Sequence, residues 1–311
     1  MNAPVVVVGE ALIDIVIPVT GESVEHVGGS PANVAIGLAR LGHETMLATH
    51  IGTDARGERI ANLLAHERVQ VMPGSIDAAR TSTAAARLDA AGVATYEFDL
   101  EWTADPSLTV PAGGHLHTGS IAATLPPGGE AVLGIVINAR DHATVSYDPN
   151  ARPSLMGTPE DARAVIERMI SLSDVVKASD EDVRWLYGET TPVEAVLAQW
   201  AELGPAVCAV TQGGREVVVR VRDEIHRMPA RSADVTDTVG AGDSFMAGLV
   251  SGLLDAGLLG GDEARTRLFA AGWPQVRPAV ERAVNCAAIT VSRAGANPPT
   301  RRDLQLASPL G

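Results

Sequence analysis

Apolar and polar residues follow two different periods along this chain, and the two periods alternate. Short, nearly continuous apolar runs, such as PVVVVGEALI at residues 4–13, are typical of buried β-strands. Longer stretches with apolar residues every three or four positions, such as PANVAIGLARLG at 31–42, predict amphipathic helices. In that stretch Val34, Leu38 and Leu41 form the apolar stripe.

The same reasoning predicts strands and helices in turn over most of the chain. Strand–helix alternation on this scale predicts an α/β fold with a doubly wound, mostly parallel sheet flanked by helices. No internal repeat or dividing linker is evident, so we expect residues 1–311 to form a single domain. Further strands are expected at 45–52, 115–120, 144–150, 174–179 and 206–214, and further helices at 56–67, 129–142, 159–173, 181–188 and 193–204.

Three segments depart from this alternation. Residues 15–29 read as extended chain, and residues 81–99 read as two strands joined by a turn at Asp89 to Gly92. Together they predict a small β-strand lid, formed by segments of about 12–27 and 81–100 inserted in the domain. Residues 215–230 predict another hairpin late in the chain.

Composition narrows the possible functions. A hydrophobic content of 46% supports a large core, and a net charge of −14 without a basic run disfavours nucleic acid as a partner. Cys208 and Cys286 lie in apolar stretches, so we expect buried free thiols in a reducing cytoplasm. Asp14 interrupts the first apolar run, and no run approaches the roughly 18 apolar residues of a membrane span, so no membrane association is expected.

The stretch DTVGAGDSFMAGLV at 237–250 places two glycines and an aspartate before an apolar run with helical spacing. Amide groups at a helix start are unpaired donors, and Gly240 and Gly242 would let an anion approach the backbone closely. Asp243 in the first turn would face the group that attacks this anion and could act as a base. The alternative is that Asp243 only favours the helix start electrostatically.

Polar residues also stand near the start of the chain, around a predicted helix start. Gly28 and Gly29 precede the helix and Asn33 lies in its first turn, an arrangement suited either to hydroxyl recognition or to an ordinary tight turn. Asp14 follows a long apolar run. If it is buried there, its carboxylate needs a polar partner such as a sugar hydroxyl; the alternative is that the strand has already ended and Asp14 is solvated.

A third polar stretch, Asp148 to Arg152, follows a buried strand. It lies either at the carboxyl-end edge where open α/β sheets bind ligands or in a turn with a surface arginine. His115 and His117 share a strand face, but without an evident third metal ligand we expect packing or hydrogen bonding there. GxxxxGK[ST] is absent, as is GxGxxG after the first strand, which disfavours P-loop and nicotinamide-dependent enzymes.

The glycine-bearing stretches together resemble the ribokinase-like (PfkB) family of carbohydrate kinases. GGSPANVAIGLARLGHETMLATHIG at 28–52 resembles the amino-terminal signature of that family, and residues 237–250 resemble its carboxyl-terminal signature. The resemblance extends from VVGEALID to AGANPPTRRDL. GEALID, YDPNAR and VVKASDEDVRWLYG are most similar to the fructokinase branch.

The resemblance implies an ATP-dependent sugar kinase that converts D-fructose to fructose 6-phosphate. Alternative acceptors are 2-keto-3-deoxygluconate, ribose or a nucleoside, and a sugar sensor without catalysis is a further alternative. The amides of Gly240, Ala241, Gly242 and Asp243 would hold the γ-phosphoryl group, and Asp243 would be the general base. The lid would exclude water and would also suit a homodimer.

The resemblance also assigns the remaining site residues. Asp14, Gly28, Gly29, Asn33 and Arg152 would hold the sugar. The nucleotide would contact Lys177, Ser179, Thr211, Gly213, Gly214, Gly240, Gly242, Val284 and Asn285. Asp182 would hold Mg²⁺ through water, in a stretch that reads Ser179-Asp-Glu-Asp182 where relatives have Asn-x-x-Glu. A monovalent cation, K⁺ in many relatives, would lie near Asp237, Val239, Thr290 and Gly295, although Pro299 replaces a serine found there in some of them.

Overall fold

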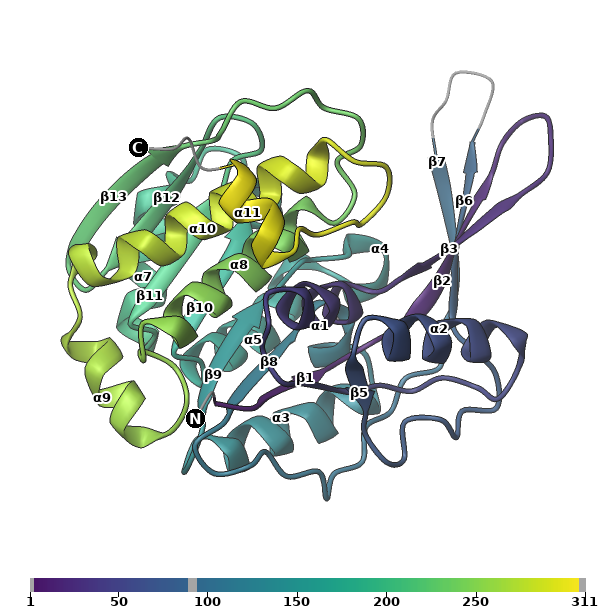
Figure 1. The fold of residues 1–311 in the computed structure, drawn as a ribbon, viewed down its shortest axis with the longest axis horizontal. Coiled ribbons are helices and arrows are strands. Elements are labelled where there is room, and N and C mark those ends of the chain that lie inside the picture. Colours follow the sequence, from purple (N-terminus) through teal and green to yellow (C-terminus); the bar gives the residue numbers. More distant parts are fainter. Residues whose placement is uncertain (1–2, 89–93, 308–311) are drawn as a thin grey trace.

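The computed structural model describes residues 3–88 and 94–307, and within them a nine-stranded sheet forms the centre of the molecule (Figure 1). Its order is β13-β12-β11-β10-β9-β8-β1-β4-β5. The strands from β11 to β5 in this order pair in parallel, whereas β12 and β13 add an antiparallel edge, so the prediction of a mostly parallel sheet is confirmed. The strands are β1 (Val5–Val8), β4 (Thr45–Ala48), β5 (Val69–Val71), β8 (His115–Gly119), β9 (Thr144–Asp148), β10 (Val175–Ser179), β11 (Val207–Thr211), β12 (Glu216–Val221) and β13 (Glu224–Pro229).

Helices cover both faces of this sheet, because successive strand residues point to opposite faces and both sets are apolar. In β1, for example, Val5 and Val7 belong to one core while Val6 and Val8 belong to the other. The first core is covered by α1 (Ser30–Arg40), α2 (Ala55–His66), α8 (Ala241–Asp255), α9 (Asp262–Ala270) and α10 (Trp273–Val291). The second is covered by α3 (Gly128–Ala139), α4 (Pro153–Met156), α5 (Pro159–Ser171), α6 (Asp180–Tyr187) and α7 (Val193–Leu203). A 3-10 turn, η1 (Ser120–Ala123), and α11 (Arg301–Ala307) complete the described elements.

A second, four-stranded sheet of described residues stands at one end of the molecule, on the right of Figure 1. It consists of β2 (Leu12–Ile17), β3 (Val24–Gly28), β6 (Thr83–Leu88) and β7 (Ala94–Asp99), in the order β3-β2-β6-β7. Asp14 in β2 lies opposite His26 in β3 and Ala84 in β6. The two extended segments therefore join in one small sheet, as the sequence predicts. The turn expected at Asp89 to Gly92 lies outside the described residues.

The prediction of one strand over residues 4–13 is wrong. The chain leaves the main sheet after Val8 and enters the small sheet at Leu12. At Gly9 it passes so close to α1 that a Cβ atom there would lie 2.2 Å from Cγ of Pro31. Gly9 and Glu10 are the signs of this break in the sequence, but the residues on both sides are buried and apolar, so the run reads as one strand. The strand expected at 45–52 is also shorter and ends at Ala48.

The histidines of β8 make hydrogen bonds within the sheet. His115 contacts the hydroxyls of Thr144 and Ser146 at 2.9 and 2.8 Å, and His117 contacts Ser146 at 3.0 Å. Burial lowers the pKa of each imidazole to about 3, so both are neutral at physiological pH. Packing and hydrogen bonding thus explain this pair, as expected from the sequence.

Cys208 and Cys286 are buried free thiols, as predicted. Among the described helices, none combines the length and the apolar composition needed to cross a bilayer.

Candidate active site

The glycine-rich stretch forms the start of α8. Gly240 caps this helix in the left-handed region, with a φ of +74° that strongly favours glycine. A Cβ atom at Gly240 would also lie 2.6 Å from Cβ of Ala296, so two separate constraints exclude a side chain here. The amides of Gly242 and Asp243 lie in the first turn, where an α-helix provides no backbone acceptor for them. The local geometry is therefore that of an anion-binding helix start.

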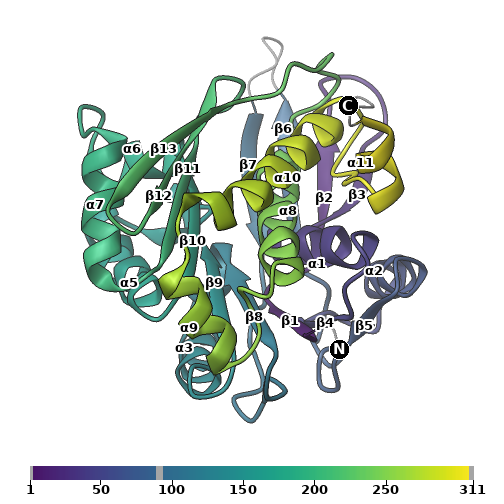
Figure 2. The ribbon, with the colours of Figure 1, turned by 60° about the vertical axis from the view of Figure 1, so that its left-hand side comes forward.

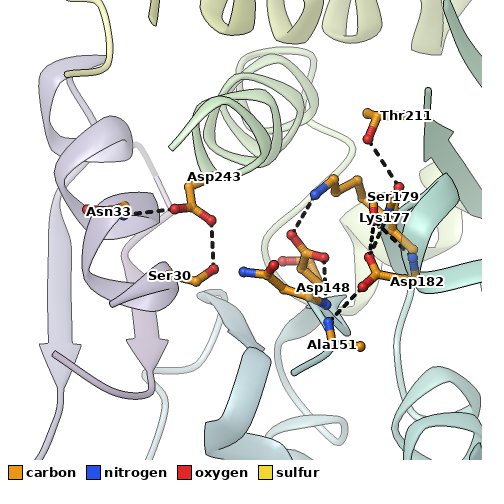
Figure 3. Close-up of polar contacts among 12 residues, drawn as sticks. Ser30, Asn33, Asp148, Ala151, Lys177, Ser179, Asp182, Thr211 and Asp243 are labelled. Carbon is orange, nitrogen blue, oxygen red and sulfur yellow. Dashed lines mark hydrogen bonds and ion pairs between the residues drawn. The ribbon is translucent and has the colours of Figure 1, made fainter. Parts of the chain in front are cut away.

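Asp243 is held by two donors from a distant part of the chain. Ser30 donates from Oγ to Oδ1 at 2.7 Å, and Asn33 donates from Nδ2 to Oδ2 at 2.8 Å (Figure 3). Both donors lie in the first turn of α1, which packs against α8 (Figure 2). The carboxylate is only 8% exposed and has a fixed orientation beside the glycine loop. Ser30 was not singled out from the sequence, although it stands beside the glycine pair at the start of α1.

Asp14 and the glycine pair are in direct contact. A Cβ atom at Gly28 would lie 1.9 Å from Oδ2 of Asp14, so the carboxylate occupies the space above that glycine. Burial raises the pKa of Asp14, while the charges of Arg152 and His26 act in the opposite direction. Gly29 has a φ of +104°, and a Cβ there would lie 2.5 Å from the backbone oxygen of Glu10. The structure thus brings together Asp14, Gly28 and Gly29, three of the five residues expected to hold the sugar.

Arg152 lies in the loop after β9, with its side chain folded onto that loop. Its Nη1 donates to the backbone oxygen and to Oδ1 of Asn150, both at 2.8 Å, and to the oxygen of Ala151 at 3.0 Å. Asn150 has a φ of +36°, an uncommon conformation for a residue other than glycine. The guanidinium charge acts on the carboxyl groups of both Glu10 and Asp14, so Arg152 belongs to the same group of side chains.

Lys177 and Asp148 form a buried ion pair beneath α8. Nζ of Lys177 lies 2.9 Å from Oδ2 of Asp148, and these side chains are 4% and 1% exposed. The ammonium also lies 3.0 Å from the position that a Cβ atom of Gly242 would occupy. Burial opposes the charge of Lys177, but the carboxylates of Asp148, Asp182 and Asp243 outweigh burial and raise its pKa. Burial raises the pKa of Asp148 to about 6 despite this ion pair.

Asp182 has a structural role that the sequence analysis did not anticipate. Its Oδ2 accepts hydrogen bonds from the amide and the hydroxyl of Ser179, each at 2.7 Å, and Ser179 caps α6 in return. Its Oδ1 accepts from the amide of Ala151 at 2.7 Å. The Ser179-to-Asp182 stretch is therefore a capping box that also anchors the loop carrying Arg152.

Apart from Gly240 and Gly242 at the start of α8, the residues expected to contact the nucleotide lie on β10, at the end of β11, in the β11–β12 turn and on α10. Thr211 donates from Oγ1 to the oxygen of Ala178 at 3.3 Å. In the turn, a Cβ atom at Gly213 or Gly214 would meet no heavy atom within 4 Å. On α10, Asn285 accepts from Nη1 of Arg231 at 2.8 Å, and Val284 packs against the first core.

Hydrogen bonds join three of the four residues expected around a monovalent cation. Asp237 accepts from the amide of Val239 at 3.0 Å and from the amide of Gly295 at 2.9 Å, and these bonds lower its pKa. Thr290 is fully buried and donates toward Oγ of Ser244 at 2.7 Å, on α8. The loop before α8 and the loop after α10 are therefore fixed to each other.

Comparison with known proteins identifies the family. The model of the pfkB family carbohydrate kinases matches residues 2–302. A fructokinase of Klebsiella pneumoniae is 35% identical over 83% of this chain and 87% of its own length. A fructokinase of Escherichia coli is 33% identical over 98% of this chain and 99% of its own.

Solved structures agree with this result. A fructokinase double mutant of Vibrio cholerae O395, crystallised with fructose, ADP and a potassium ion, superimposes with a TM-score of 0.82. It is 26% identical and covers 98% of both chains. An aminoimidazole riboside kinase of Salmonella enterica, with a TM-score of 0.80 at 24% identity, shares the fold. The resemblance seen in the sequence is confirmed, and this chain belongs to the pfkB family of carbohydrate kinases.

Proposed function

We propose that this protein transfers the γ-phosphoryl group of ATP to D-fructose and produces fructose 6-phosphate. The observation that carries the proposal is the position of the Asp243 carboxylate, which Ser30 and Asn33 hold beside the glycine-rich start of α8. The fructokinase names of the relatives, and the fructose and ADP in the Vibrio cholerae structure, support the choice of acceptor.

In the proposed reaction Asp243 accepts the proton of the 6-hydroxyl as that oxygen bonds to the γ-phosphorus and the bond to ADP breaks. The carboxylate need not be strongly basic, because the hydroxyl becomes more acidic as the new bond forms. The amides of Gly240, Ala241, Gly242 and Asp243 stabilise the charge on the phosphoryl oxygens. Ser30 and Asn33 keep the carboxylate oriented, so little reorganisation is needed during the step.

Lys177 supports the nucleotide side of the site in this proposal. Its ammonium lies directly beneath Gly242 and attracts the phosphates toward the start of α8. The other nucleotide contacts are Ser179, Thr211, Gly213, Gly214, Gly240, Gly242, Val284 and Asn285. Asp148 keeps the ammonium in place, because an unpaired lysine would be costly at this depth.

The oxygen donors of the site fit Mg²⁺, which prefers carboxylates and water. Both carboxylate oxygens of Asp182 already accept hydrogen bonds, so Asp182 would hold the ion through water rather than directly. When bound, Mg²⁺ neutralises part of the phosphate charge. A monovalent cation such as K⁺ would lie where Asp237, Val239, Thr290 and Gly295 meet.

Asp14, Gly28, Gly29, Asn33 and Arg152 hold the sugar in this proposal, and the small sheet acts as a lid over it. The lid strands also provide a surface for a homodimer. The proposal keeps the cytoplasmic location expected from the sequence, the compartment that supplies ATP. The alternative acceptors 2-keto-3-deoxygluconate, ribose and a nucleoside would use the same chemistry.

The test is ADP release from Mg-ATP, with and without potassium, in the presence of fructose, ribose, glucose, 2-keto-3-deoxygluconate or a nucleoside. We expect a clear preference for fructose. Activity with another acceptor would keep the mechanism and change the substrate. No ADP release with any acceptor, together with thermal stabilisation by a sugar, would instead indicate a sugar sensor without catalysis.

A further inference from the structure

Glu10 is a buried acidic residue to which neither the sequence analysis nor the proposed mechanism gives a role. It lies two residues after β1, at the carboxyl-end edge of the main sheet, where β1 is the third strand from the β5 edge. Its backbone oxygen lies against Gly29, immediately before the helix whose first turn holds Asp243. Open α/β sheets bind their ligands at this edge.

The Glu10 side chain is 6% exposed, and one of its oxygens lacks a partner. Oε2 is shielded from solvent and accepts no hydrogen bond from any residue in 3–88 or 94–307. A buried carboxyl oxygen without a donor destabilises a fold by about 1–3 kcal/mol. A native structure tolerates such an atom most readily where a ligand supplies the missing donor.

The groups that act on Glu10 come from three other elements. Ser120, at the start of η1, hydrogen-bonds its carboxyl group, Arg152 follows β9, and Asp243 belongs to α8. Ser120 itself has a φ of +55°, in the left-handed region that non-glycine residues seldom adopt. Such backbone conformations occur preferentially at ligand sites, because the surrounding structure must hold them in place.

Arg152 has a matching set of unused donors. Only its Nη1 donates hydrogen bonds to described residues, and these go to the oxygens of its own loop. Within the described chain, Nε and Nη2 of Arg152 have no acceptor. The charge of Arg152 acts on the carboxyl group of Glu10. Unused donors on one side chain and an unused acceptor on the other therefore lie within electrostatic reach of each other.

A sugar hydroxyl is the group that satisfies both, because it accepts one hydrogen bond and donates another. We propose that a non-reacting hydroxyl of the acceptor sugar bridges Arg152 and Glu10, accepting from the guanidinium and donating to Oε2 of the carboxylate. Nε or Nη2 of Arg152 supplies the donor while Nη1 keeps its bonds to the loop, and Glu10 acts as a specificity residue for the acceptor. This inference rests on the proposed sugar-kinase function.

The bridge requires an ionised Glu10, which gives the site a dependence on pH. Burial raises the pKa of Glu10 to about 7, Arg152 and Ser120 act against this rise, and Asp243 adds to it. The affinity for the sugar is therefore expected to fall as the pH is lowered from 8 to 6. Among the described groups that act on Glu10, Arg152 is the only positively charged one, and Asp243 is the only negatively charged one.

The test compares Glu10→Gln with the wild type by calorimetric titration of D-fructose and its monodeoxy analogues. Glutamine has the same shape as glutamate. When its side-chain oxygen accepts from Ser120, its NH₂ group faces the sugar hydroxyl and cannot accept the hydrogen bond that the carboxylate would accept. We expect the dissociation constant for D-fructose to rise about 10- to 100-fold, with little change for ATP. The analogue that lacks the bridging hydroxyl should bind the wild type weakly. Its dissociation constant should be the same for Glu10→Gln, because there is no bridging hydrogen bond left to lose.

The exposed residue Glu58 on α2 provides the matched control, and Glu58→Gln should leave all these constants unchanged. The inference is overturned if Glu10→Gln binds fructose and every analogue as wild type does, while the wild type remains an active kinase. Should Glu10→Gln fail to fold, Glu10→Asp decides: weaker fructose binding with retained pH dependence supports the bridge, and unchanged binding refutes it. If the wild type prefers another acceptor, the same titrations are made with that sugar.

Discussion

The hydroxyl of Ser30 donates a hydrogen bond of 2.7 Å to the carboxylate of Asp243, although 213 positions separate the two residues in sequence. The bond joins the first turns of α1 and α8. It therefore connects the Gly28-Gly29 turn before α1 with the start of α8, which is expected to bind an anion. A base that must receive a proton from one defined hydroxyl benefits from this fixed orientation.

Replacement of Ser30 by alanine should therefore lower turnover more than binding. Loss of one hydrogen bond to a carboxylate is expected to reduce kcat about 10-fold and to leave KM for the sugar within about twofold. Steady-state kinetics of Ser30→Ala would measure this split, with the exposed Ser107→Ala as control. A large rise in KM with unchanged kcat would show that Ser30 binds the sugar instead.

Asp243→Asn should retain sugar and ATP binding and slow turnover at least about 100-fold, the usual scale for loss of a general base. The amide keeps the size of the carboxylate but cannot accept the proton. Calorimetry of both ligands and single-turnover rates would establish the two parts of this prediction. Near-normal turnover would remove Asp243 from its proposed role.

The buried pair of Lys177 and Asp148 should make the stability of Lys177→Met depend on pH. Without the ammonium, the Asp148 carboxylate is buried and uncompensated, which costs about 3–5 kcal/mol of unfolding free energy. Burial already raises the pKa of Asp148 to about 6, above its usual range, and loss of Lys177 raises it further. The carboxyl therefore takes up a proton as the pH falls, and the destabilisation shrinks.

Urea unfolding of wild type and Lys177→Met at pH 8 and pH 5.5 would measure this effect. The double variant Lys177→Met/Asp148→Asn removes both charges and should recover much of the stability at pH 8. An equal loss at both pH values would mean that packing, rather than charge, is responsible.

Gly242→Ala tests how closely the ammonium and the anion loop fit together. The new methyl group would lie 3.0 Å from Nζ of Lys177, which a bond to Asp148 holds in place. We expect a folded protein with a turnover about 10-fold lower and a weaker affinity for ATP. Gly134→Ala on α3, where the added Cβ meets nothing within 4 Å, is the control and should be neutral or slightly stabilising. Wild-type kinetics in Gly242→Ala would contradict the proposed fit.

Glu10→Gln should stabilise the fold at high pH. The pKa of Glu10 is about 7 in the folded protein and 4.5 in the unfolded chain, so the folded state binds the proton more strongly. Stability from this group is present below pH 4.5 and is lost as the pH rises through 7, by about 3 kcal/mol in all. The neutral variant avoids this loss.

The difference in unfolding free energy between Glu10→Gln and wild type should therefore favour the variant more at pH 8 than at pH 5. Urea unfolding at the two pH values measures it, and Glu58→Gln should show no such change. A difference independent of pH would contradict the buried, ionised state of Glu10 above pH 7.

Features encoded in one short stretch could be predicted from the sequence, and contacts between distant stretches could not. Gly240, Gly242 and Asp243 form the start of α8 as expected, because glycines before an apolar helical repeat determine that geometry locally. Ser30 and Glu10 were missed because their neighbours are set by the order of strands in the sheet and by the packing of α1 on α8.

Two other differences have a similar cause. The strand predicted at 4–13 breaks at Gly9, where α1 passes close to the chain. A glycine within an apolar run is a local sign of such an approach, but it does not show which element comes near. For Asp182, the resemblance indicated a magnesium role and the structure adds two contacts. The capping box with Ser179 is local to the start of α6, whereas the bond from the amide of Ala151 depends on how the β9 loop meets α6.

The order of elements along the chain also affects how the protein emerges from the ribosome. Strands β1 to β13 all precede residue 230, whereas α8 begins at Ala241 and α10 at Trp273. Both helices cover one face of the main sheet. A nascent chain can pair its strands before these helices are synthesised, and until then it exposes an apolar sheet face. Premature termination near residue 240 should therefore produce an insoluble fragment that lacks the base, a substrate for chaperones or proteases rather than a slow kinase.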